Sequence, residues 1–168
     1  MEVKINVQEP GWFAAKMVKN RPLVRNAVQG DSVKTYIASV APNILFLYCT
    51  KRYIETLTER CPGALFFYRN PQRTEPQAIE EKQMRNFMLV TSAPEEYLIR
   101  LDDVSREFLQ GQRVRVTGGI FGGVEGVVKR VKGDRRLIVS ITGIACVATA
   151  FIHPALLEPV PDDPGGGK

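Results

Sequence analysis

The chain has 168 residues, of which 44% are hydrophobic and 24% charged, a composition typical of a globular protein with one or two small domains. No apolar run approaches the ~20 residues of a transmembrane helix, and the first residues lack the apolar stretch of a secretory signal, so we expect a cytoplasmic protein without a membrane partner. The net charge is +5, and residues 111–160 contribute +4 of it, an excess too modest to establish a nucleic-acid partner.

Few residues offer catalytic or metal-binding chemistry. Cys49, Cys61 and Cys146 are odd in number and form no CxxC pair, which argues against disulfides and zinc and predicts buried reduced thiols. The only histidine, His153, has no cysteine or serine placed to form a dyad, so we expect a structural role. Acidic residues also occur in adjacent pairs, whose side chains diverge on a regular helix or strand instead of meeting at one substrate. These pairs are Glu80-Glu81, Glu95-Glu96 and Asp102-Asp103. We therefore predict no catalytic residue, no metal and no cofactor.

The N-terminal part alternates between strand and helix patterns. Capping residues and helical spacing predict three helices, the last of them beginning at or near Pro76. β-branched, aromatic and aliphatic runs predict four strands between them. These elements indicate a mixed domain over residues 1–92. The predicted strands cover 12–18, 33–40, 43–50 and 64–70, and the predicted helices cover 19–30, 50–63 and 75–92.

The C-terminal part carries strand patterns alone. Residues 93–110 show no sustained period and are predicted to be a linker, and residues 161–168 a disordered tail. Short strands with glycine-bearing turns between them predict a small β-barrel over 111–160. Its strands are expected at 112–117, 124–131, 136–142, 145–151 and 155–160.

The segment 114–131, VRVTGGIFGGVEGVVKRV, is unusually rich in glycine for a strand region. A phosphate-binding loop would need Lys and Ser or Thr after its last glycine, but Val127 and Val128 follow Gly126, and GxGxxG is absent. A tightly bent barrel fits better, because Gly118-Gly119 permits a turn with positive φ and Gly126 permits a close backbone approach. The segment therefore favours a binding module over an enzyme.

This segment resembles the KOW motif, through Val114, Val116, Gly119, Phe121, Gly122 or Gly123, Gly126 and Val128. The N-terminal part resembles the NusG N-terminal domain, through Trp12-Phe13-Ala14, the strand 42–47, the strand at 64–68 and the following helix. The NusG-family pattern PGYxFV reads here Pro42-Asn43-Ile44-Leu45-Phe46-Leu47, and the segment 17–43 is short for the family. The linker and the ending look closest to the specialised antiterminators of surface-polysaccharide operons.

The resemblance implies an α+β fold, with an NGN-like antiparallel sheet flanked by helices and an SH3-like KOW barrel. It also implies a non-enzymatic transcription elongation or antitermination factor that binds the clamp helices of RNA polymerase and suppresses pausing or termination. The residues carried over to that interface are Trp12, Phe13, Ile44 and Phe46. The alternative for each is a place in the core of the sheet.

For the barrel, the resemblance implies recruitment of Rho or a small-subunit ribosomal protein through Ile120 and Phe121. The alternative for Phe121 is to fold back over the barrel. A basic run surrounds the turn at Gly133-Asp134 and is either a solvated hairpin or a contact with a nucleic-acid backbone. An alternative function is therefore a ribosome- or RNA-binding KOW protein. The basic residues are Lys129, Arg130, Lys132, Arg135 and Arg136.

Overall fold

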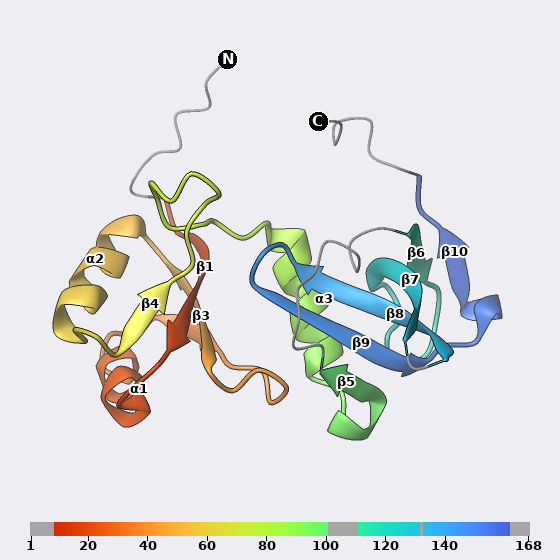
Figure 1. Cartoon of the computed structure of the whole chain (residues 1–168), viewed down its shortest axis with the longest axis horizontal. Coiled ribbons are helices and arrows are strands. Elements are labelled where there is room, and N and C mark those ends of the chain that lie inside the picture. Colours follow the sequence, from red (N-terminus) through yellow and green to blue (C-terminus); the bar gives the residue numbers. More distant parts are fainter. Residues whose placement is uncertain (1–8, 101–110, 132, 162–168) are drawn as a thin grey trace, which may run out of the picture. The chain divides into compact units, whose positions relative to one another are not determined.

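The computed structural model describes residues 9–100, 111–131 and 133–161. Its contacts divide the chain into two compact units, Met1–Glu81 and Lys82–Lys168. Each unit contains an antiparallel sheet, and helices accompany the sheets, so the predicted α+β class is confirmed (Figure 1). The sequence placed the end of the first domain at residue 92, whereas the contacts divide the chain after Glu81. The helix α3 (Glu81–Thr91) therefore belongs, except for its first residue, to the second unit.

The first unit is a four-stranded antiparallel sheet with the strand order β2-β3-β1-β4. β1 and β3 form its centre and pair from Gly11 opposite Cys49 to Lys16 opposite Ile44. Two helices connect the strands, and both lie on one side of the sheet (Figure 1). In chain order the elements are β1 (Gly11–Met17), α1 (Arg21–Gln29), β2 (Lys34–Tyr36), β3 (Ile44–Cys49), α2 (Lys51–Arg60) and β4 (Leu65–Phe67).

The two helices begin at polar capping residues. The side chain of Asn20 accepts a hydrogen bond from the Leu23 N–H before α1, whose first turn contains a proline. Thr50 Oγ1 accepts from the Tyr53 N–H, at 3.2 Å, before α2. Both helices thus begin directly after a capping residue, α1 after Asn20 and α2 after Thr50.

The segment before α3 differs from the prediction. The sequence places the start of this helix at or near Pro76, but Pro76 forms a β-bridge with Arg69, and the Ile79 N–H donates to the Trp12 carbonyl at 2.9 Å. These residues extend the edge of the first sheet instead of starting a helix. The helix therefore begins only at Glu81.

The second unit contains α3 and a six-stranded antiparallel sheet with the order β10-β6-β7-β8-β9-β5. The strand β5 corrects the sequence analysis, because it lies in the predicted linker and pairs with β9 from Leu98 opposite Thr149 to Arg100 opposite Val147. The elements after α3 are the 3₁₀ turn η1 (Glu95–Tyr97), β5 (Leu98–Arg100), β6 (Gln112–Val116), β7 (Glu125–Val131), β8 (Asp134–Ile141), β9 (Ala145–Phe151), the 3₁₀ turn η3 (Pro154–Leu156) and β10 (Leu157–Pro159).

Gly126 explains part of the glycine content of the second unit. A Cβ at this position would lie 2.4 Å from the Ile138 carbonyl oxygen and 2.9 Å from Leu137 Cδ1. No real Cβ atom tolerates such a contact with backbone, so the neighbouring strands pack this closely only around a glycine. The close approach predicted at Gly126 is confirmed. Gly119 and Gly123, with φ of 76° and 87°, supply the left-handed turns before it.

Candidate interaction surfaces

The pairing of β1 with β3 assigns each side chain of the first sheet to one of two faces. Phe13 pairs with Leu47, and both belong to the core cluster beneath α1 and α2. Trp12, Ile44 and Phe46 alternate with them and therefore lie on the opposite face. The four residues predicted to bind polymerase thus divide, three on the face away from the two helices and Phe13 on the helix-covered face. All four are buried.

The face away from α1 and α2 is rich in aromatic residues, and we call it the aromatic face. Register places a ring from every strand on it. Trp12 meets Tyr48 edge to face, with ring centroids 5.5 Å apart, and Tyr36 packs against Phe46. The aromatic face comprises Trp12, Tyr36, Phe46, Tyr48 and Phe66.

Two residues of the aromatic face are exposed, and the sequence analysis missed both as contact residues. Phe66, on the edge strand β4, is 57% exposed, and Tyr48, at the end of β3, is 38% exposed. Trp12 and Phe46 are instead 7% and 0% exposed. The signal was present in the alternation, because Tyr48 follows Phe46 by two residues and must share its face.

A polar cluster fixes the helix-covered side of the first unit. Asp31, after α1, accepts hydrogen bonds from the Tyr53 hydroxyl at 2.7 Å and from the Arg60 guanidinium, both on α2. These two hydrogen bonds lower the pKa of Asp31, the one from Tyr53 contributing most. Burial and the same contact with Asp31 raise the pKa of Tyr53. The cluster joins the two helices, and we assign it a structural role.

In the glycine loop of the second unit, residues 118–123, two adjacent apolar residues differ in their exposure to solvent. Ile120 is 66% exposed, whereas Phe121 is 6% exposed and its carbonyl accepts the Val124 N–H. Phe121 is therefore folded back against its own unit, which is the second of the two possibilities that the sequence left open. A Cβ at Gly118 would lie 3.7 Å from Leu156 Cδ2, so the exposed Leu156 lies next to this loop. The sequence analysis did not single out Leu156.

Glu125 is the buried acid of the second unit. Its carboxylate lies 2.6 Å from the Arg115 guanidinium and 2.8 Å from Lys82 Nζ. Burial alone would raise the pKa of Glu125, but the hydrogen bonds from Lys82 and Arg115 outweigh it and hold the pKa below its ordinary value. Gln83 also exchanges hydrogen bonds with Thr142. The first turn of α3 is thus attached to the second sheet by side-chain contacts.

The basic hairpin between β7 and β8 places like charges opposite each other. Arg130 pairs in register with Arg135, and both are exposed. Lys129 pairs with Arg136, whose guanidinium donates to the Val131 and Thr149 carbonyls and to Asp134. Arg136 therefore already has partners within its own unit. The fifth predicted nucleic-acid contact, Lys132, lies outside the described residues.

The cysteines and the histidine lie in environments that indicate a structural role. Cys49, Cys61 and Cys146 are buried and unbonded, as predicted, and burial raises the pKa of Cys49 to about 12 and that of Cys146 to about 11. The Ala155 N–H donates to Nδ1 of His153 at the start of η3. In the described part of the chain, no group of acidic, cysteine or histidine side chains could hold a metal ion. Nor does any helix there have the length and apolarity required to cross a membrane.

Comparison with solved structures connects these surfaces to a known fold. The chain is similar to NusG from Thermotoga maritima, solved in a study of its domain interaction, with a TM-score of 0.51 and 14% identity, over 93% of this chain and 100% of that chain. A chain of the MjSpt4:Spt5 complex matches 89% of this chain and 96% of its own length at 14% identity, but its TM-score of 0.35 is too low to support an argument. No family model and no curated protein matches the sequence. At this identity, the likeness shows a NusG-like fold.

Proposed function

We propose that this chain is a transcription elongation factor that binds RNA polymerase through the aromatic face of its first unit. The observation that carries the proposal is the exposure of Tyr48 and Phe66 on that face of a sheet with a NusG-like fold. Exposed rings beside an apolar centre suit docking, because aromatic anchors supply much of the binding energy of protein interfaces. The factor acts in the cytoplasm and needs no catalytic residue.

The polymerase contact is proposed for Tyr48 and Phe66 at the exposed rim of the aromatic face, and the buried residues Trp12, Ile44 and Phe46 support this contact from within the same face of the sheet. Phe13 faces α1 and α2, so we propose that it supports β1 from below instead of touching the clamp helices. By holding the clamp closed, the bound factor suppresses pausing and termination, the role of the specialised antiterminators that the sequence resembles.

A second surface recruits a further partner. We propose the exposed Ile120, with its neighbour Leu156, as the contact for Rho or a small-subunit ribosomal protein. Phe121 is buried beside it and contributes to this contact only if the loop opens. The two surfaces lie on different units, so one factor would connect polymerase with a second protein.

The test is binding of the full chain to purified core RNA polymerase at low and at moderate salt. The double variant Tyr48→Ala, Phe66→Ala is expected to weaken binding at least about tenfold. Leu23→Ala is the matched control, because Leu23 is an exposed apolar residue on α1, and it is expected to change binding less than about twofold. No saturable binding, or equal affinity of the double variant and the native chain, would contradict the proposal.

RNA or ribosome binding is the second candidate function, and the exposed pair Arg130 and Arg135 favours it. Contacts with phosphate release counterions, so such binding would fall steeply with salt, whereas apolar docking would not. Binding that disappears at moderate salt and in Arg130→Glu, but persists in Phe66→Ala, would support this function instead.

A further inference from the structure

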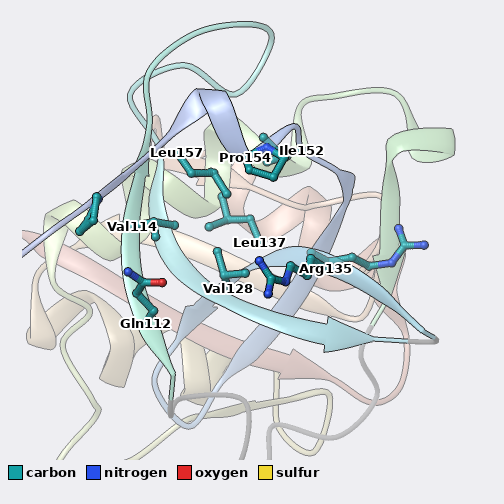
Figure 2. A pocket seen from close by; sticks show the side chains of 10 residues that line it. Gln112, Val114, Val128, Arg135, Leu137, Ile152, Pro154 and Leu157 are labelled. Atoms are coloured by element: carbon teal, nitrogen blue, oxygen red, sulfur yellow. The ribbon is translucent and has the colours of Figure 1, made fainter.

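A pocket of about 170 Å³ lies in the second unit, against one face of its sheet. Its lining includes Gln112, the first residue of β6, and Leu157, which pairs with Val116, the last residue of that strand. Figure 2 shows Val114, Val128, Leu137 and Leu157 gathered around the pocket. Register explains why these side chains meet, since Val128 pairs with Leu137, and alternation along β6 and β7 places Val114 on the same face. The pocket is thus built mainly by strands, with Pro154 of η3 beside them, and Ile120 is not among its lining residues.

The size and lining of the pocket limit what it can hold. An apolar cavity of about 150 Å³ accommodates one benzene ring, whereas drug-sized ligands need about 300 Å³ or more. The lining consists of aliphatic side chains, prolines, two arginines and one glutamine, without an aromatic ring. Single-stranded nucleic acids bind largely by stacking their bases on aromatic rings. The lining therefore fits one aliphatic side chain better than a base.

The rim of the pocket is cationic. Arg135 lines it, and Arg130 lies directly opposite Arg135 across the hairpin, on the face that Val128 and Leu137 share. Like charges in directly paired positions destabilise a sheet. Among the described residues, the neighbouring acid Asp134 pairs with Arg136, and no ion pair involves Arg130 or Arg135. The two arginines are thus available to an external anion.

We propose that this pocket binds a partner peptide in which an aliphatic side chain is flanked by acidic residues. The aliphatic side chain enters the pocket, and the neighbouring carboxylates lie between Arg130 and Arg135. Charge complementarity with the rim and the absence of aromatic rings from the lining favour an acidic peptide over RNA. This site is independent of the polymerase surface, and its test does not depend on polymerase binding.

The test is a titration of the isotope-labelled full chain, followed by NMR, with the acetylated peptide Asp-Glu-Leu-Asp-Glu. We expect saturable shifts of the Gln112, Val128 and Leu137 amides, with a dissociation constant on the order of 1 mM or tighter. A peptide with Ser in place of Leu should bind at least about tenfold more weakly, since the apolar anchor is lost. An oligouridine RNA should not shift these amides.

Arg135→Glu should weaken the Leu peptide at least about tenfold and should leave the chain folded, because it places opposite charges across the hairpin. Arg85→Glu makes the same charge change on the exposed side of α3 and should leave affinity within about twofold. Equal losses in the two variants, shifts caused by RNA alone, or no saturable shift would overturn the proposal. A large gain in affinity on deleting residues 162–168, which contain Asp162 and Asp163, would identify the chain's own tail as the occupant and overturn the proposed partner.

Discussion

The aromatic face and the glycine loop both expose apolar side chains, but they select these side chains differently. On the aromatic face, strand alternation decides, and Tyr48 must share a face with Phe46, two residues before it. In the loop, the adjacent residues Ile120 and Phe121 differ from 66% to 6% exposure. The orientation there is set by the backbone turns at the glycines. Contact residues on strands can therefore be predicted from the alternation of side chains along the sequence, whereas contact residues at a loop tip depend on the folded backbone.

Truncating a side chain should affect stability far more at the centre of the aromatic face than at its rim. Phe46→Ala should lower the free energy of unfolding by about 3–5 kcal/mol, because Phe46 is fully buried. Phe66→Ala should change it by less than about 0.5 kcal/mol while weakening polymerase binding. Urea unfolding followed by the fluorescence of Trp12, the only tryptophan, measures the free energy of unfolding of both variants. Similar losses of stability in the two variants would show that the rim is also structural.

The next effect applies the same test to the glycine loop. Phe121→Ala should lower stability by about 3 kcal/mol, since it removes a buried ring. Ile120→Ala should have an effect below about 0.5 kcal/mol. Hydrogen exchange of the β7 amides reports on this unit. If Ile120→Ala raised the exchange rates as much as Phe121→Ala, Ile120 would have a structural role in the loop, and its exposure would not indicate a binding site.

A smaller effect is expected at Gly126. Gly126→Ala should cost about 1–3 kcal/mol, because the new Cβ would meet the Ile138 carbonyl oxygen. Gly118→Ala is the control, since a Cβ there would make only an ordinary contact, 3.7 Å from Leu156. Circular dichroism during thermal unfolding compares the two variants. A neutral Gly126→Ala would mean that β7 and β8 can separate without loss of stability.

The smallest effect concerns the charges around Glu125. Its folded pKa lies below the ordinary 4.5, so its ion pairs stabilise the fold above about pH 4.5, and this stabilisation is lost as the pH falls through the folded pKa. Glu125→Gln should lower stability by about 1 kcal/mol at pH 7, because the partners Lys82 and Arg115 are half exposed. The difference should be smaller at about pH 3 than at pH 7, because acid protonates the Glu125 carboxylate and removes its ion pairs.

Urea unfolding at both pH values measures this effect. Glu158→Gln serves as the control, because Glu158 is 52% exposed and lies 3.3 Å from the same Arg115. A loss at pH 7 that persisted unchanged in acid would assign the effect of Glu125→Gln to packing instead of charge.

The sequence predicted the elements whose patterns are local. The strand β3 lies within its predicted bounds 43–50 and the helix α2 within 50–63, because a run of apolar residues marks the strand and helical spacing marks the helix. The strand β5 was missed because three residues show no period, and its pairing with β9 is far away in the chain. The start of α3 was misplaced because bridges to Arg69 and Trp12 hold the preceding residues extended.

The interaction surfaces were predictable in part. Trp12, Ile44 and Phe46 share one face, but Phe13 does not, a division that strand parity alone reveals. The pocket at Gln112 could not be predicted, because β6, β7, β8 and β10 contribute its lining and only their register brings the residues together.

The edge strand β10 limits how the second unit can meet other proteins. The Thr117 N–H donates to the Leu156 carbonyl, and the Val160 N–H donates to the Arg113 carbonyl. In this antiparallel pattern the backbone polar groups of Leu157 and Pro159 point away from β6. The Leu157 N–H is used by the Pro154 carbonyl, and Pro159 has no N–H to offer. An incoming strand would find no free backbone N–H on Leu157 or Pro159, which disfavours pairing at this edge. Proteins that bind along β10 are therefore expected to be recognised through side chains. Non-specific pairing with the sheet edges of other proteins is disfavoured.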